Sequence, residues 1–359
     1  MTIERSPWGR TPDGEAVHRF DLRNGNGMSA SIATYGGAVL SLTVPDKNGE
    51  PGEVLLGFDD LAGYLNHDWY SGCLVGRVAN RIQNASITLG GETFQLDRNH
   101  GKHQLHGGAG GFNTRVWRAA ASETPDGPEL RLMLTSPHLD QGYPGEMRVS
   151  AVYALRPDNT LVLTLSAVAD RPSVVNLTNH MYFHLGGEQA VARGEDCTGH
   201  VLEIMAGHFL PTDGELIPTG EIAPVAGTPL DFTSPRTIGE RVGLNDELLR
   251  AARGYDHCMV LDQAAQPARG LTLAARVLEP SSGRRLELST DMEALQFYSG
   301  NFLSPGTVGR NGAIYGFRTG FCLEPQAYVD APHHPAFPSI AIDTGETYRR
   351  RIEYCFSAA

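Results

Sequence analysis

Short runs in which apolar and polar residues alternate recur along most of the chain, and this period of two predicts strands. Clear runs cover residues 17–22, 28–34 and 38–44 near the N-terminus and residues 129–169 in the middle. Glycine, asparagine and proline separate them, as in chains that reverse direction through tight turns. We therefore predict an all-β, largely antiparallel protein with few short helices.

Local turn signals predict two hairpins and one helix. Gly90-Gly91 separates the strand-like residues 87–89 and 93–96, and Ser281-Ser282-Gly283 separates residues 271–279 from 285–290. The helix is expected after Asn245 as its cap, with Asp246 and Glu247 at its positive end, Arg250 and Arg253 at its negative end, and Gly254 as its stop.

Residues 175–185 alternate as one strand would, and they carry the most informative face of the chain. That face consists of Asn176, Thr178, His180, Tyr182 and His184, whereas the other face is mostly apolar. A polar face inside a sheet is expected where the sheet lines a cleft. Imidazole transfers protons near neutral pH, so His180 is a candidate catalytic residue. The alternative is a hydrogen-bonded structural histidine.

Three further positions are candidates for binding or catalysis. Asn80-Arg81 puts a planar guanidinium beside an amide, a pair able to bind vicinal hydroxyls or a carboxylate. Asp256 follows the predicted helix, where it is either a functional carboxylate or the cap of a turn. Glu324 ends a short apolar strand before a proline, and an ionised carboxylate is costly to bury there without a partner.

Two patterns that suggest a cofactor or metal are better explained otherwise. His100, His103 and His106 are spaced like the ligands of a cupin-type metal site, but glycines surround them and no glutamate stands at a ligand-like spacing. We expect no metal, and glycines 107–111 are expected to let a ligand approach the backbone. Residues 25–30 match G-x-G-x-x-A but continue as strand, so we predict a hairpin and no nucleotide cofactor.

Composition narrows the class of protein. The chain has 359 residues, a net charge of −12 and five cysteines without a Cys-x-x-Cys pair. The negative charge argues against nucleic acid and anionic membranes as partners. Scattered cysteines are typical of reduced thiols, and no apolar run is long enough to span a bilayer. We expect a cytoplasmic enzyme or binding protein.

Five motifs together resemble the galactose mutarotase (aldose 1-epimerase) family. They are Gly76-Arg77-Val78-Ala79-Asn80-Arg81-Ile82, Leu105-His106-Gly107-Gly108, Asn176-Leu177-Thr178-Asn179-His180, Tyr255-Asp256-His257 and Leu323-Glu324-Pro325-Gln326. Their order and spacing extend the resemblance over nearly the whole chain. It implies a single domain over residues 1–359, a large antiparallel β-sandwich with an open cleft on one sheet.

The resemblance also implies residue roles. The family's general acid falls on His180 and its general base on Glu324. The residues that hold the sugar fall on Asn80, Arg81, His106, Asp256 and Gln296. Cys258 stands where the family commonly has asparagine, which puts a secondary contact in doubt and leaves the catalytic pair untouched.

The implied reaction interconverts the α and β anomers of a free aldohexose such as galactose or glucose. A base takes the proton of the C1 hydroxyl while an acid protonates the ring oxygen, which needs no cofactor if Glu324 is ionised and His180 protonated. The open alternatives are a hexose 6-phosphate mutarotase, with Arg77 as a second phosphate contact, and a non-catalytic sugar-binding protein. The chain is expected to be a monomer or a homodimer.

Overall fold

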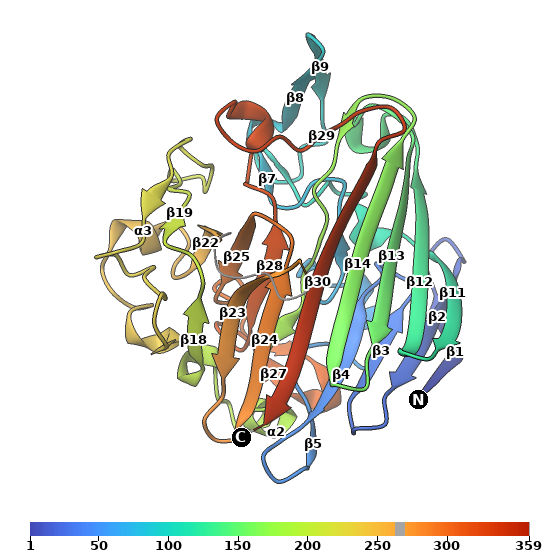
Figure 1. Ribbon diagram of the computed structural model, residues 1–359, viewed down its shortest axis with the longest axis vertical. Helices are drawn as coiled ribbons and strands as arrows, with labels where there is room; N and C mark the ends of the chain where they lie inside the picture. The colour runs from blue at the N-terminus through green and yellow to red at the C-terminus, as the bar shows by residue number, and fades with distance from the viewer. Residues whose placement is uncertain (263–269, 359) are drawn as a thin grey trace.

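The computed structural model describes residues 1–262 and 270–358, and its regular structure is mostly β-strand (Figure 1). The three α-helices of this described part are short, namely α1 Leu61–Leu65, α2 Glu188–Ala192 and α3 Glu247–Arg250. None of the helices among these residues is long and apolar enough to cross a membrane. The prediction of an all-β fold with few short helices is confirmed.

Within the described residues, the largest sheet has nine strands in the order β11-β12-β13-β14-β30-β24-β23-β18-β21. Their bounds are β11 Arg118–Thr124, β12 Gly127–Ser136, β13 Met147–Leu155, β14 Thr160–Ala169, β30 Thr347–Ala358, β24 Arg284–Thr290, β23 Thr272–Leu278, β18 Val201–Ile204 and β21 Arg236–Thr237. Neighbouring strands are antiparallel. The antiparallel pattern predicted for residues 129–169 is therefore confirmed.

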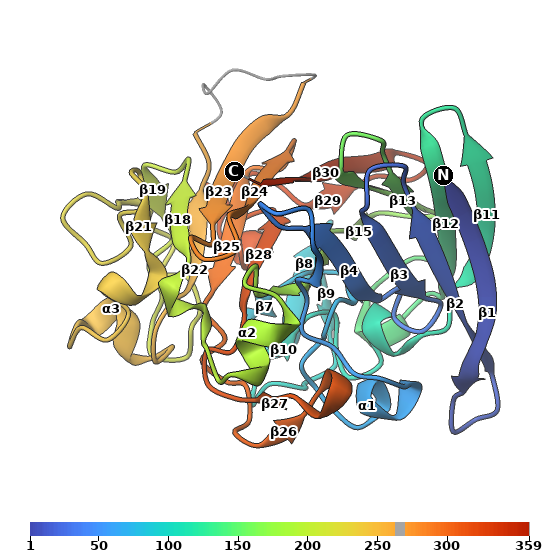
Figure 2. The same ribbon diagram turned by 90° about the horizontal axis from the view of Figure 1, so that it is seen from below.

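Two smaller sheets face the large one, and Figure 2 shows them side by side beneath it. In the described chain the first has five strands, β1 Thr2–Arg10, β2 Ala16–Arg23, β3 Ser29–Ala33, β4 Val39–Pro45 and β5 Pro51–Glu53. The second has six there, in the order β17 Tyr182–Phe183, β28 Phe321–Gln326, β25 Ala294–Tyr298, β22 Asp256–Val260, β19 His208–Phe209 and β20 Ala223–Pro224. This second sheet carries most of the candidate site.

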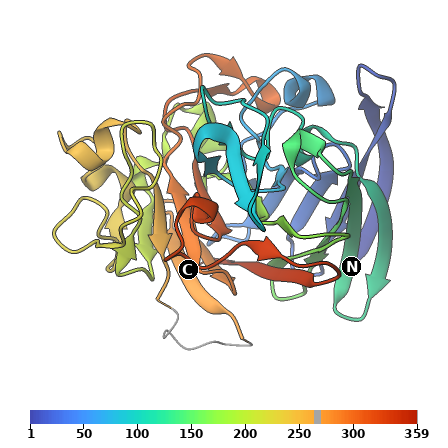
Figure 3. The same cartoon turned by 90° about the horizontal axis from the view of Figure 1, so that it is seen from above.

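The remaining elements are short. The strands are β6 Leu74–Val75, β7 Arg81–Ile82, β8 Ser86–Leu89, β9 Glu92–Gln95, β10 Gln104–Leu105, β15 Ser173–Val174, β16 Thr178–Asn179, β26 Thr307–Val308, β27 Ile314–Tyr315 and β29 Ala341–Ile342. Single 3₁₀ turns cover Gln83–Ala85, Phe112–Thr114, Asp140–Gly142, Cys197–Gly199, Ile238–Glu240, Arg310–Gly312 and Ala331–His333. Seen from above, the cyan segment that includes β8 and β9 lies over the centre of the molecule (Figure 3).

One buried apolar cluster fills the space between the three sheets. Leu42 of β4, Leu163 of β14, Leu288 of β24, Phe297 of β25 and Leu323 of β28 all belong to it. Because successive side chains of a strand point to opposite faces, the six-stranded sheet packs one face on this core and turns the other away from it. That second face is available for a binding site.

The local turn predictions hold for the hairpins and only in part for the helix. Both predicted hairpins, β8–β9 and β23–β24, are confirmed, as is the one at residues 25–27, which joins β2 to β3. The helix is a single turn, and its cap is Asp246 instead of Asn245, since the Asp246 carboxylate accepts from the backbone N–H of Leu248. One turn is stabilised by its tertiary contacts rather than by its own propensity.

The prediction of one continuous strand over residues 175–185 is wrong. In that stretch the described chain has two short strands, β16 and β17, which pair with different partners, β6 and β28 respectively. Both of its predicted faces are buried. The alternation is present in the residue types, but the backbone changes partner every few residues, which a periodicity argument does not detect.

Candidate active site

Three adjacent strands bring an amide and two carboxylates to the face that points away from the core. Gln296 on β25 lies opposite Glu324 on β28 and opposite Cys258 on β22. Asp256 precedes Cys258 by two residues, so its side chain lies on the same face, and its Oδ1 accepts a 2.6 Å hydrogen bond from Nε2 of Gln296. Asp256 is thus a strand residue, and Glu324 lies inside β28 rather than at its end.

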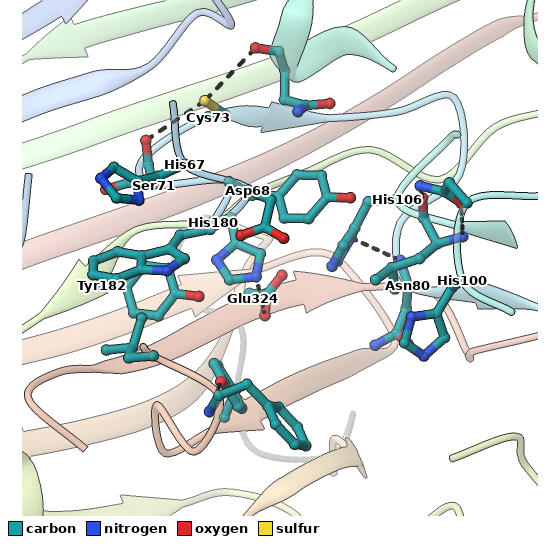
Figure 4. Close-up of a pocket in the computed structure, with 18 of the residues that line it drawn as sticks. His67, Asp68, Ser71, Cys73, Asn80, His100, His106, His180, Tyr182 and Glu324 are labelled. Carbon is teal, nitrogen blue, oxygen red and sulfur yellow. Dashed lines mark hydrogen bonds and ion pairs between the residues drawn. The ribbon is translucent and has the colours of Figure 1, made fainter. Parts of the chain in front are cut away.

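His180 reaches this face from the irregular backbone between β16 and β17. Its N–H donates to the carbonyl of Cys73 over 3.0 Å, and its carbonyl accepts from Gly72 over 2.9 Å. These two bonds direct the ring toward β28, where Nε2 lies 3.6 Å from Oε1 of Glu324 (Figure 4). The histidine and the glutamate predicted as the catalytic pair are therefore in contact, and both are almost fully buried.

His106 approaches from the loop after β10, next to Asn80. The His106 N–H donates to the Asn80 carbonyl over 2.9 Å, and the Asn80 N–H donates to Nδ1 of His106 over 3.2 Å. Since Nδ1 accepts, the neutral ring carries its proton on Nε2. Burial lowers the pKa of His106 well below its usual value, and the nearby His180 and Arg81 lower it further. His106 is therefore a neutral hydrogen-bond donor in the cleft.

Gly107, which follows His106, allows its own backbone to lie against that of Gly76. The sequence had instead suggested that glycines here let a ligand approach the backbone. Gly107 has φ +88°, and a Cβ there would lie 2.0 Å from the carbonyl oxygen of Gly76. No other residue fits so close a contact in that conformation. The packing of this loop on the segment after β6 places His106 beside Asn80.

Arg81 completes the polar wall of the cleft. Its Nη1 donates to Oδ1 of Asn80 over 3.1 Å, and its Nη2 lies 3.5 Å from Oδ2 of Asp256. Its Nε, together with Oε1 of Gln296 and Oε2 of Glu324, is buried without a hydrogen-bond partner among the described residues. Unpaired buried polar atoms are costly, so the atoms of Arg81 and Glu324, which line the cleft, are suited to a ligand rich in hydroxyl groups.

The space in front of these residues is a cleft of about 1020 Å³. Asn80, Arg81, His106, His180, Asp256 and Glu324 line one part of it, and Phe58, Tyr64, His67, Trp69, Tyr70 and Phe302 line another. Gln296 lies behind Asp256 and is not on the cleft surface. A polar floor next to aromatic rings is typical of sites that bind sugars through hydroxyl hydrogen bonds and ring stacking.

Burial is the main cause of the pKa shifts of His180 and Glu324. It raises the pKa of Glu324 well above its usual value, and the negative charge of Asp256 raises it further while Arg81 opposes this. Burial lowers the pKa of His180 to about 4. Both shifts favour the neutral forms of the two side chains, whereas the reaction expected from the sequence needs the carboxylate and the imidazolium.

The site contains one group of side chains that suggests a metal. His106, His180 and Glu324 offer ligand atoms within 4.8 Å of one another. A metal needs a free imidazole lone pair, yet Nδ1 of His106 is occupied by the Asn80 N–H, which leaves the proton on Nε2. This donor set does not fit a metal well. His100 and His103, the other two histidines of the spacing considered in the sequence, do not belong to this group.

Arg77 lies outside the cleft, so the suggestion of a second phosphate contact is wrong. Its guanidinium is buried and donates to the carbonyls of Ser136, Pro137, Pro144 and Gly145 and to the hydroxyl of Ser136. These partners belong to the end of β12 and the loop after it, and Nη1 also lies 3.5 Å from the hydroxyl of Ser173 on β15. Arg77 therefore anchors the segment that carries Asn80 and Arg81.

Sequence reasoning missed two residues that touch His180. The ring of Tyr70, which has φ +58°, lies 4.6 Å from that of His106 and 5.9 Å from that of His180. The thiol of Cys322 lies 3.5 Å from Nδ1 of His180. Cys322 could have been found from the sequence, because it lies two residues before Glu324 on one predicted strand and so shares its face. Tyr70 could not, because its segment shows no alternation typical of a strand.

Comparison with known proteins agrees with this geometry. The family described as aldose 1-epimerase matches residues 18–355. This chain belongs to the aldose 1-epimerase family. Galactose mutarotase from Mus musculus is 36% identical over 360 residues, covering 100% of both chains, and aldose 1-epimerase from Escherichia coli (strain K12) is 37% identical over 349 residues, covering 97% of both.

A solved structure of the family also matches the fold. The crystal structure of galactose 1-epimerase from Lactobacillus acidophilus NCFM superposes with a TM-score of 0.86 at 26% sequence identity, covering 100% of this chain and 99% of that one. The family resemblance of the sequence motifs and the predicted antiparallel architecture are thereby confirmed.

Proposed function

We propose that this protein is an aldose 1-epimerase that interconverts the α and β anomers of a free aldohexose, with galactose and glucose as the expected substrates. The observation that carries this proposal is the contact between His180 and Glu324 in the floor of a polar cleft. A protein that only binds sugar has no need of a buried acid–base pair, so the contact disfavours the non-catalytic alternative.

The pair performs the reaction by moving protons. The Glu324 carboxylate takes the proton of the C1 hydroxyl while His180 protonates the ring oxygen, and the ring opens to the aldehyde. Rotation about the C1–C2 bond and closure on the other face reverse both transfers. Oε1 of Glu324 and Nε2 of His180 lie 3.6 Å apart, so one bound sugar can be within reach of both groups.

The remaining wall residues hold the sugar. Arg81 presents a donor and Asp256 an acceptor side by side in the cleft, an arrangement that suits two adjacent hydroxyl groups of a sugar. His106 donates through Nε2, and Asn80 and Gln296 orient Arg81 and Asp256 respectively. All these contacts are hydrogen bonds to uncharged hydroxyl groups of the sugar, and the proposed proton transfers need no metal or other cofactor.

The charges of the cleft favour a neutral sugar over a hexose 6-phosphate. Of the described residues that line it, Asp68, Glu215, Asp256 and Glu324 are acidic, and Arg81 is the single arginine or lysine. A phosphate group is normally met by several basic side chains or by a helix N-terminus. Arg77, the other basic candidate, is used elsewhere.

Polarimetry of fresh α-D-galactose and α-D-glucose with the purified protein tests the proposal. We expect rapid mutarotation of both sugars, a lower kcat/KM for their 6-phosphates, and no change after exhaustive chelation. A clear preference for a phosphorylated sugar would establish the alternative substrate, and activity lost on chelation and restored by added metal would contradict the cofactor-free mechanism. The absence of any mutarotation would contradict the function itself.

We also propose a single domain in the cytoplasm, acting as a monomer or a homodimer. The continuous core shared by the three sheets supports one domain. All five cysteines are free thiols, and four of them are buried, which suits a reducing compartment. Size-exclusion chromatography with light scattering distinguishes the two oligomeric states.

A further inference from the structure

We propose that the thiol of Cys322 is a positioning residue that fixes the tautomer of His180, by donating to Nδ1 and so keeping the imidazole proton on Nε2. Nε2 is the nitrogen that faces Glu324 and the cleft. This inference rests on the proposed function, because it explains how the general acid keeps its proton on the side of the sugar.

Strand β28 contacts both nitrogens of the imidazole. Cys322 and Glu324 are two residues apart on the same face of β28, a separation of roughly 7 Å along a strand. The Cys322 sulfur lies 3.5 Å from Nδ1, and the Glu324 carboxylate lies 3.6 Å from Nε2. Cys322 is held in register by its pairing with Tyr182 on β17. The ring therefore sits between two side chains of one rigid strand.

The protonation of the thiol determines the direction of the hydrogen bond. Burial raises the pKa of Cys322 well above its usual value, and the nearby carboxylates of Glu324 and Asp256 raise it further, so the sulfur keeps its hydrogen. A thiol that donates to Nδ1 leaves the proton of a neutral imidazole on Nε2. A carboxylate at this position would accept from Nδ1–H and raise the basicity of the ring, whereas a donating thiol orients the ring without that effect.

Other groups also face His180, and one of them competes for Nδ1. The titratable neighbours are Cys322 and Glu324 of β28, Tyr182 of β17, Tyr298 of β25, Asp256 of β22, His106 after β10 and Tyr70 before β6. The backbone carbonyl of His180 itself lies close to the ring and would accept from an Nδ1–H. The two partners of Nδ1 thus favour opposite tautomers, and the tautomer can be measured.

Nitrogen-15 NMR of the histidine rings tests the proposal directly on the sugar-free protein at pH 7. The His180 signals are those missing from the His180→Asn variant. We expect the proton on Nε2 in the wild type and in Cys322→Ser, whose hydroxyl also donates, and a shift toward Nδ1–H in Cys322→Ala. Cys197→Ala is the matched control, since that thiol is equally buried but contacts the carbonyl of Ser299.

Kinetics provide the second measurement. In Cys322→Ala we expect kcat to fall about tenfold, the effect of losing one weak hydrogen bond, with KM nearly unchanged and with partial recovery in Cys322→Ser. A wild-type proton on Nδ1, an unchanged tautomer in Cys322→Ala, or a shifted tautomer with an unchanged kcat would overturn the proposal. The NMR result does not depend on activity, so a failure of the proposed function would be recognised separately.

Discussion

At the scale of single residues, one shared proton is the central feature of the site. The pKa of His180 is lowered to about 4 and that of Glu324 is raised well above its usual value, both mainly through burial. Between these two limits the pair holds a single proton, on one residue or the other. Such a pair always contains one acid and one base, which is the requirement for opening and closing a sugar ring.

Removing either half of the pair should abolish most of the activity. Glu324→Gln and His180→Asn keep the size of the side chain but remove the titrating group, so each should lower kcat by about 10²–10⁴-fold. The double variant should lose less than the product of the two single losses, because the residues act as one unit. Polarimetry of folded variants measures this, and near-normal rates in either single variant would place the acid and base elsewhere.

The rate of the wild type should be bell-shaped in pH. Below about pH 4 His180 gains a proton while Glu324 keeps its own, so the pair has no base. Above the raised pKa of Glu324 the pair holds no proton and has no acid. The acid limb should disappear from the residual activity of Glu324→Gln. A profile with an acid limb near neutral pH would contradict the single shared proton.

Asp256 should act mainly through binding. Asp256→Asn keeps the shape but loses the charged acceptor that faces Arg81, and a hydrogen bond to a charged group contributes roughly 1.5–3 kcal/mol. If the sugar contacts are the same in the ground and transition states, KM should rise more than kcat falls. Asp343→Asn, on an exposed turn, is the control. Wild-type kinetics in Asp256→Asn would show that this carboxylate is only structural.

At the scale of elements, the register of three antiparallel strands assembles the site. β22, β25 and β28 place Asp256, Gln296 and Glu324 on one face because residues two apart on a strand share a face and cross-strand partners lie opposite each other. A slip by one residue in any of them would turn its polar side chain into the apolar core. The segment after β6 is held at the same place by the bonds of Arg77 to the loop after β12 and by backbone hydrogen bonds to Asn176.

Arg77 should therefore be important for stability although it does not touch the cleft. Lysine cannot reproduce the planar fork of donors, and several of the four carbonyls around the guanidinium would lose their partners. We expect Arg77→Lys to lower the free energy of unfolding by about 3 kcal/mol in urea denaturation. Arg276→Lys, at a half-exposed arginine in surface ion pairs, should cost less than about 1 kcal/mol. Equal effects would mean that the carbonyl cage is not a structural anchor.

At the scale of the whole molecule, the sandwich buries ionisable groups that are not part of the site. His200 is almost fully buried, its Nε2 accepts from the N–H of Leu185 over 2.9 Å, and its Nδ1 lies 3.1 Å from the carbonyl of Cys197. This arrangement fits only the neutral ring with its proton on Nδ1. Burial accordingly lowers the pKa of His200 to about 3.

His200 should make the protein less stable as the pH falls. Its pKa is lower in the folded than in the unfolded state, where it is about 6.5, so its contribution is present above pH 6.5 and is lost on acidification toward pH 3. Between pH 7 and 5 this amounts to roughly 2 kcal/mol of unfolding free energy. His200→Gln, which keeps a donor and an acceptor without titrating, should flatten this decline in urea denaturation. Parallel curves for both proteins would contradict the assignment.

The sequence by itself determined the local features of this protein. Alternating residues and turn glycines predicted the strands of residues 129–169 and the β8–β9 and β23–β24 hairpins, because such signals act between neighbours in the chain. The motifs around Arg81, His180 and Glu324 indicated the family and the residues of the candidate site. Each of these conclusions needs only the identity and spacing of nearby residues.

Only the tertiary structure decided what depends on distant partners. The interrupted pairing of residues 175–185, the carbonyl cage around Arg77 and the contact of Cys322 with His180 each involve segments far apart in the chain. The raised pKa of Glu324 follows mainly from burial, which the whole sandwich creates. Local periodicity carries no information on cross-strand partners or on the loss of solvent, and these two physical effects determine the chemistry of the cleft.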